Sequence, residues 1–193
     1  MQAHEIVTKL DKPTADRRPL VQHIIADVDV HEVIAALASH PTPRLVRQIL
    51  CDILGYKADK QAVPVLLTAL QDLDEHVRSS AADALAKIGE ESTGQPLFKQ
   101  YQREVPSSPV RSLILAAFGA VKYTPAISTL ISALTDADEA VRLCAAWALG
   151  ALQAHEAQSA LQQALLTEPS DSSAAHNMRE ALQNLGSIEH SPS

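Results

Sequence analysis

The chain has 193 residues, a formal net charge of −7, six glycines and only six aromatic residues. Alanine (31 residues) and leucine (24 residues) together make up more than a quarter of it. Because alanine and leucine favour helices, whereas strands favour β-branched and aromatic residues, this composition predicts an all-α fold and excludes a β-sandwich. The length suits one domain or a short array of repeats.

The N-terminal residues and the two cysteines indicate the compartment. Residues 1–10 contain no basic start followed by an apolar core, so no secretory signal is visible. The longest apolar run, residues 113–121, is shorter than the roughly 20 residues that cross a bilayer. Cys51 and Cys144 lie far apart, without a second Cys or a His at metal-ligand spacing. We therefore expect a soluble, cytoplasmic protein that binds neither membrane nor metal.

An internal repeat dominates the sequence. The dipeptide Val-Arg begins at Val46, Val77, Val110 and Val141, with spacings of 31, 33 and 31 residues. Positions counted from this Val repeat as well: position +8 is Leu or Phe, position +9 is Gly or Ala, position +20 is Leu, and position +24 is Leu or Tyr. Such a period indicates a stack of similar structural units.

Each unit is predicted to contain two helices. The first begins near the Val and ends at the glycine of position +9, which supplies a left-handed cap or lets the next backbone approach closely. The second begins near a proline in three units, at Pro64, Pro96 and Pro125. Three residues before the Val stands a side chain that can cap the first helix. These predicted capping residues are Asp74, Ser107 and Asp138.

Such helical pairs bury their apolar faces only by stacking, so we predict one α-solenoid of about five helical pairs plus a terminal capping helix. The predicted pairs lie near residues 16–40, 43–71, 74–103, 107–135 and 138–167, the capping helix at 173–186, and a disordered tail at 187–193. The segment from Gln2 to Leu10 is a candidate for one additional helix.

The repeat resembles a known family. Asp138-Glu139-Ala140-Val141-Arg142 followed by Ala146-Trp147-Ala148-Leu149-Gly150 is similar to HEAT repeats, especially the short bacterial subtype named after phycobilisome lyases. Pro43 and Ser107 replace the Asp of this pattern, and Ala86 replaces its Gly. The resemblance implies an armadillo-like helical fold. It also implies one alternative function, that of a bilin lyase-like subunit acting on phycobiliproteins.

The arginines of the repeated dipeptide are expected to be structural. Each can bond to the link between neighbouring units and its acids, as the resemblance also implies. The proposed ladder consists of Arg47, Arg78, Arg111 and Arg142, with the acids Asp74 and Asp138. A ladder that bound nucleic acid would need surplus positive charge around it, and there is little.

Candidate catalytic groups do not converge in the sequence. His-Glu pairs begin at His4, His31 and His155, but they occupy different places in the repeat. Deoxyhypusine hydroxylase, which is built from similar repeats, holds iron with such pairs at matching positions. We therefore predict no catalytic residue, no metal site and no cofactor, and favour a non-enzymatic protein without excluding an enzyme.

The second helices are expected to line a concave face that is small, neutral and mildly apolar, which suits a protein segment. The candidate partner-binding residues are Val65, Thr68, Ala69, Lys99, Gln100, Arg103, Thr129, Ser132, Ala133, Ala160, Gln163 and Ala164. Trp147 joins them as either an exposed anchor or a packed residue, because its position is Asp in two other units.

The sequence thus favours a non-enzymatic scaffold or assembly chaperone that binds another protein. Only Lys99 and Arg103 are basic among the candidate residues, so nucleic-acid binding or DNA repair is a disfavoured alternative. From Asp136 onward there are eight acids against two arginines, so a partner that meets this end is expected to be basic.

Overall fold

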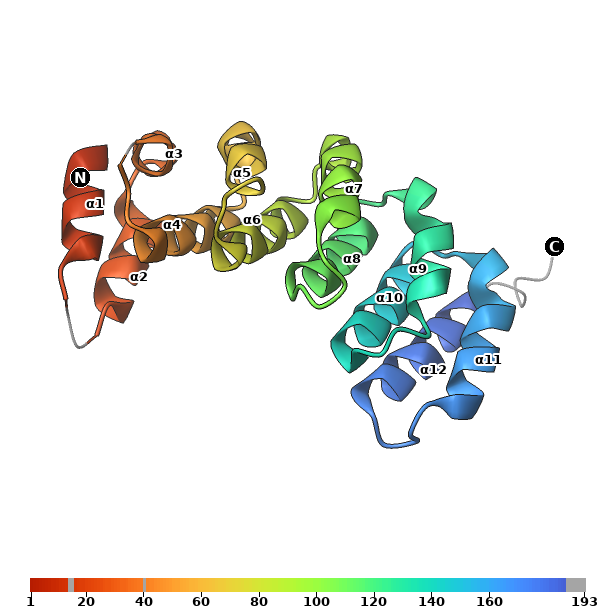
Figure 1. The fold of residues 1–193 in the computed structure, drawn as a ribbon. Helices are drawn as coiled ribbons and strands as arrows, with labels where there is room; N and C mark the ends of the chain where they lie inside the picture. The colour runs from red at the N-terminus through yellow and green to blue at the C-terminus, as the bar shows by residue number, and fades with distance from the viewer. Residues whose placement is uncertain (14–15, 40, 187–193) are drawn as a thin grey trace. The chain divides into compact units, whose positions relative to one another are not determined.

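The computed structural model describes residues 1–13, 16–39 and 41–186. Within these ranges the chain forms twelve α-helices, four short 3₁₀-helices and no strand, which confirms the predicted all-α class (Figure 1). Contacts divide the chain into two compact units, Met1–Pro96 and Leu97–Ser193. No helix in the described ranges is both long enough and apolar enough to cross a bilayer.

The first unit contains the expected additional helix, one degenerate helical pair and the first regular repeats. Its helices are α1 (Ala3–Asp11), α2 (Arg18–Asp27), α3 (Val30–Ala38), α4 (Arg44–Lys57), α5 (Val63–Ala69) and α6 (Glu75–Ile88). α4 packs along α6 in one layer, and α3 and α5 lie over them in a second layer (Figure 1). α1 packs on α3 and covers the start of the array.

The second unit continues the alternation of first and second helices. The division falls inside α7 (Gly94–Arg103), and the following helices are α8 (Val110–Ala120), α9 (Ile127–Ala133), α10 (Glu139–Ala151), α11 (Gln158–Thr167) and α12 (Ser173–Gly186). α10 packs between α8 and α12, while α9 and α11 cover this layer. The helical pairs fall within the predicted ranges, and the predicted tail at 187–193 lies outside the described residues. A single array running through both units stays a prediction.

The glycines of position +9 let first helices approach closely, and they do not end them. Gly55, Gly119 and Gly150 each lie inside a helix, with one or more helical residues after them. A Cβ placed on Gly55 would lie 2.9 Å from the Cα of Ala84, and one on Gly119 would lie 2.8 Å from the Cα of Ala148. The sequence left two roles open for this glycine. The structure supports close backbone approach and not the cap.

The turn between the two helices of a repeat has its own recurring geometry, which the sequence analysis missed. Position +12 has a positive φ in every regular repeat, and a 3₁₀ turn follows two residues later. The +12 residues are Ala58 (φ 49°), Gly89 (φ 73°), Lys122 (φ 55°) and Gln153 (φ 52°). Only one of the four is glycine. A left-handed backbone favours glycine over every other residue, so a glycine repeated at +12 would have predicted this turn. Because three of the four repeats have another residue there, the sequence signal was too weak to predict it.

Exchanging the residue types at position +12 should therefore move stability in opposite directions. Ala58→Gly should raise the free energy of unfolding of the first unit by about 1 kcal/mol, and Gly89→Ala should lower it by about as much. Urea denaturation followed by circular dichroism would measure both changes. Equal signs for the two variants would contradict the role assigned to this turn.

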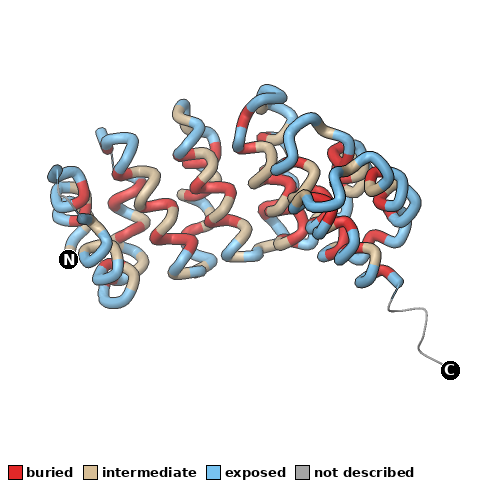
Figure 2. The backbone as a smooth tube through the Cα atoms, turned by 90° about the horizontal axis from the view of Figure 1, so that it is seen from below, coloured by how far each residue is buried: buried red, intermediate tan, exposed pale blue. Residues whose placement is uncertain are grey.

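The core follows the repeat positions (Figure 2). The Val of the Val-Arg pair and the Leu of position +20 are buried in all four regular repeats. An aromatic cluster fills part of the second unit, where the ring centroids of Phe98 and Tyr101 lie 6.0 Å and 6.2 Å from that of the fully buried Phe118. Tyr123 joins it at 5.7 Å from Phe118. Phe98 and Tyr101 are half-buried and pack against this ring.

Candidate functional site

Arginines of the Val-Arg pairs bind the link that follows their own repeat. Arg47 donates from Nε and Nη2 to the two carboxylate oxygens of Asp72, at 2.7 Å and 2.9 Å. Arg142 binds Glu168 in the same forked way, at 2.7 Å and 2.9 Å. Burial favours a raised pKa for Asp72, but the bonds from Arg47 and the Asp74 amide outweigh it and the pKa is lowered. Both arginines thus bind acids within the fold, but these acids are Asp72 and Glu168, whereas the predicted ladder acids Asp74 and Asp138 accept from helix amides.

The other two arginines also bind the links between repeats. Arg111 donates to Asp136 at 3.1 Å and to the Tyr101 hydroxyl at 2.7 Å, and its guanidinium lies 5.0 Å from the Tyr101 ring centroid. Arg78 donates to the carbonyl oxygens of Asp72 and Leu73. Neither arginine is placed as a surface cation for nucleic acid.

Two of the three predicted helix caps are present. Asp74 accepts from the amides of His76 and Val77, and Asp138 accepts from the amide of Ala140. Ser107 is exposed, and its neighbour Ser108 accepts from the Val110 amide at 3.3 Å. Pro109 precedes α8 directly, so the cap is displaced by one residue from the predicted position.

The second helices expose a narrower surface than the sequence predicted. Position +22 is exposed in every regular repeat, and position +19 is partly buried at each candidate residue. The exposed residues are Thr68, Lys99, Ser132 and Gln163, and the partly buried ones are Val65, Thr129 and Ala160. These seven residues can contact a partner without any rearrangement.

Position +23 is buried, contrary to the expectation that it points outward. Ala69, Ala133 and Ala164 are 7%, 4% and 5% exposed, and Gln100 is 8% exposed. On a helix, position +23 lies one turn after +19 and +20 and shares the face of the buried leucine. The apolar stripe is therefore wide enough to bury these side chains, which leaves little of them for a partner.

A hollow lies between consecutive second helices of the first unit. It has a volume of about 160 Å³ and opens beside α3 and α5. Its walls are Leu37, Ala38, Arg47, Val65, Thr68, Ala69 and Asp72. Because the Arg47 and Asp72 charges satisfy each other, the hollow offers mainly an apolar wall with a hydroxyl at its edge.

Trp147 does not belong to the second-helix surface. It lies on α10, in the layer of first helices, and is 42% exposed. A Cβ placed on Gly119 would lie 2.8 Å from its Cζ3 atom, so one edge of the indole packs on α8. The residue is thus both a packed side chain and an exposed one, which combines the two alternatives that the sequence left open.

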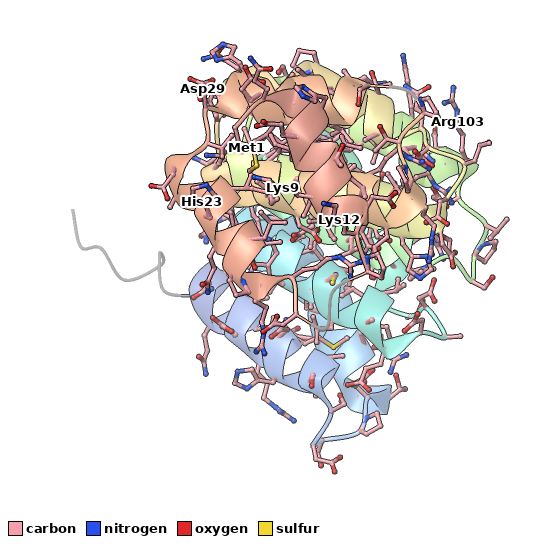
Figure 3. The ribbon with its side chains drawn as sticks, turned by 90° about the vertical axis from the view of Figure 1, so that its left-hand side faces the viewer. Met1, Lys9, Lys12, His23, Asp29 and Arg103 are labelled. Atoms are coloured by element: carbon pink, nitrogen blue, oxygen red, sulfur yellow. The ribbon has the colours of Figure 1, made fainter. Side chains whose placement is uncertain are left out.

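Basic side chains are not gathered along the second helices. Among the candidate residues only Lys99 and the exposed Arg103 at the end of α7 are basic (Figure 3). Lys9 and Lys12 lie on α1 and directly after it, at the N-terminal end of the first unit (Figure 3). A row that neutralises phosphates needs adjacent cations, and the described second helices do not provide one.

The His-Glu pairs lie on different elements. His4 is on α1, His31 on α3 and His155 in the short helix His155–Ala157, and all three are exposed. In the described ranges no three His, Cys, Asp or Glu side chains are grouped as they would be around a metal ion. Burial raises the pKa of Cys51 to about 12, so its thiol stays protonated near neutral pH.

Comparison with known proteins agrees with this architecture. The sequence pattern of HEAT repeats matches residues 30–108 and 96–186. A search of curated proteins finds no match by sequence.

Solved structures of other proteins also resemble the chain. One comes from the complex of CpcE and CpcF of phycocyanin lyase from Nostoc sp. PCC7120, with 20% identity, coverage of 96% of this chain and 95% of that chain, and a TM-score of 0.61. A designed armadillo repeat protein has 18% identity, coverage of 95% and 100%, and a TM-score of 0.61. An engineered protein has 20% identity, coverage of 95% and 88%, and a TM-score of 0.58. At these identities the likeness shows the α-solenoid fold.

Proposed function

This chain belongs to the HEAT-repeat family, and on that premise we propose that it is a non-enzymatic scaffold or assembly chaperone whose second helices bind a segment of another protein. Stacked HEAT repeats place one equivalent exposed position on each second helix, and these positions form a row with regular spacing. Such a row suits an extended protein surface better than a small molecule.

The exposed row at position +22 is the observation that carries the proposal. In the second unit Lys99, Ser132 and Gln163 occupy it on α7, α9 and α11. Thr129 and Ala160 lie one turn before Ser132 and Gln163, and their small side chains leave room for a partner. One basic residue among the three exposed positions gives a surface without strong charge, which favours contact with a protein segment.

The double substitution Ser132→Arg with Gln163→Arg should remove partners that use this row. Both side chains are exposed, so the larger charged residues can be accommodated without disturbing the core. We expect binding to weaken about tenfold or more, because bulky charges would meet a surface that the partner must desolvate. Affinity purification with quantitative mass spectrometry, followed by titration of each recovered protein, would measure the loss.

Ala140→Arg is the matched control, since Ala140 is exposed on the first helix α10 of the same unit. Partners of the second-helix row should be retained by this variant and lost with the double variant. Equal retention by both, with unchanged circular dichroism, would show that the second-helix row is not the binding surface.

The alternative, a bilin lyase-like subunit, has its own readout. Mixing the chain with an open-chain tetrapyrrole and a phycobiliprotein should then change the visible absorption spectrum. An unchanged spectrum would argue against this alternative and would leave the scaffold proposal standing.

A further inference from the structure

A single exposed tryptophan, Trp147, lies on the first helix α10 of the second unit. Trp147 occupies position +6, where two other repeats have Asp52 and Asp83. Its side chain is 42% exposed, and its indole N–H has no acceptor within the described part of the chain. The third regular repeat has Ala116 at this position, so Trp147 is the single aromatic residue there, and an exposed indole of this size indicates a contact site.

A small hollow adjoins this indole between α10 and α12. It has a volume of about 90 Å³, at the place where Gly150 approaches Ala181. Glu180, Asn177 and Asn184 of α12 line it opposite Trp147. An aromatic ring, a carboxylate and two amides thus surround one opening.

The carboxylate of this hollow has no cation of its own. No lysine or arginine pairs with Glu180 among the residues that the structure describes. The two arginines after Asp136 are bound elsewhere: Arg142 to Glu168, and Arg179 to the carbonyl oxygen of Ser170. Between Asp136 and Gly186 seven acids accompany only these two arginines, so this part of the unit attracts a positive group.

We propose that this hollow, formed by Trp147, Glu180, Asn177 and Asn184, receives an arginine side chain of a basic protein partner. A planar guanidinium can stack on an indole face while its N–H groups donate two parallel hydrogen bonds to a carboxylate. In this hollow Trp147 and Glu180 would take these two roles, and the amide oxygen of Asn184 would be a further acceptor. Trp147 lies in the first-helix layer, so the site is separate from the proposed second-helix row and does not rest on it.

The fluorescence of Trp147 offers a direct test, because it is the single tryptophan of the chain. The full chain would be titrated with N-acetyl-arginine amide and, in parallel, with the neutral isostere N-acetyl-citrulline amide at millimolar concentrations. We expect a saturable change in emission with the arginine derivative alone. Two-dimensional NMR should show the side-chain amide signals of Asn177 and Asn184 moving in the same titration.

Glu180→Gln should weaken the apparent affinity on the order of three- to tenfold, because it removes the charge and keeps the shape. Glu156→Gln is the matched control, since it removes one exposed acid of the same unit outside the hollow and should leave the affinity unchanged. Equal responses to arginine and citrulline, or equal affinities for the two variants and the unchanged protein, would overturn the proposal. Neither result would bear on the second-helix row.

Discussion

Replacing Gly119 with alanine is expected to lower the free energy of unfolding of the second unit by about 2 kcal/mol, although alanine is the better helix former by about 1 kcal/mol. The added Cβ would lie 2.8 Å from the Cα of Ala148, and backbone cannot move aside as a flexible side chain can. It would also lie 2.8 Å from Cζ3 of Trp147, so α8 and α10 would have to separate. Urea denaturation followed by circular dichroism would measure the loss, and the emission of Trp147 would report it locally.

The other two glycines of the second unit give this prediction a graded control. A Cβ on Gly150 would lie 3.1 Å from the Cα of Ala181, a milder contact, so Gly150→Ala should cost less than Gly119→Ala. Gly186 has no atom within 4 Å of such a Cβ, and Gly186→Ala should leave stability unchanged or raise it by less than about 1 kcal/mol. If all three variants behaved alike, close helix approach would not explain why glycine stands at position +9.

The same glycines show what the sequence could and could not predict. The period of the repeat predicted the four regular helical pairs, because Val, Leu and Gly recur at fixed positions and such regularity reflects the stacking of similar faces. It could not distinguish a glycine that ends a helix from one that admits a neighbouring backbone. In the structure the repeated glycine Gly119 packs against Ala148, and Gly89, which stands outside the repeated positions, takes the left-handed turn.

Surface assignments failed for a different physical reason. Ala69, Ala133 and Ala164 are small, so their presence beside a leucine stripe fits an exposed position and a buried one equally well. The width of the buried stripe depends on how closely neighbouring helices approach, which the positions along one helix do not reveal. Trp147 was singled out correctly as unusual, yet its neighbours on α12 could be identified only once the helices were placed.

Replacing Arg142 with alanine is expected to lower the free energy of unfolding of the second unit by about 3 kcal/mol at neutral pH, because the variant leaves an unpaired carboxylate inside the protein. The Glu168 side chain is only 5% exposed, and it receives two bonds from Arg142 and one from the Ser172 hydroxyl. Arg142 also donates to the carbonyl oxygens of Asp136 and Ala137, so its loss frees two further acceptors.

Two controls separate the cost of an unpaired Glu168 carboxylate from the effect of losing an arginine as such. They are Arg179→Ala and the double variant Arg142→Ala with Glu168→Gln. Arg179 is exposed and, within the described ranges, donates to the carbonyl oxygen of Ser170 alone, so its removal should cost less than about 1 kcal/mol. Glu168→Gln removes the stranded charge, so the double variant should regain part of the stability that Arg142→Ala loses. A double variant less stable than the single one would show that the charge of Glu168 is not the cause.

The pH dependence identifies the carboxylate independently. The bonds from Arg142 hold the pKa of Glu168 below its ordinary value, so Glu168 stabilises the fold above the pKa of the unfolded chain. That stability is lost as the pH falls through the lowered pKa of the folded protein.

In Arg142→Ala, burial without a partner should raise the pKa of Glu168, and protonation then removes the cost of an unpaired charge. The stability difference between the unchanged protein and Arg142→Ala should therefore be largest near neutral pH and shrink in acid, as denaturation at a series of pH values would show. A difference that stayed constant with pH would assign the loss to the carbonyl contacts of Arg142 instead of its bond to Glu168.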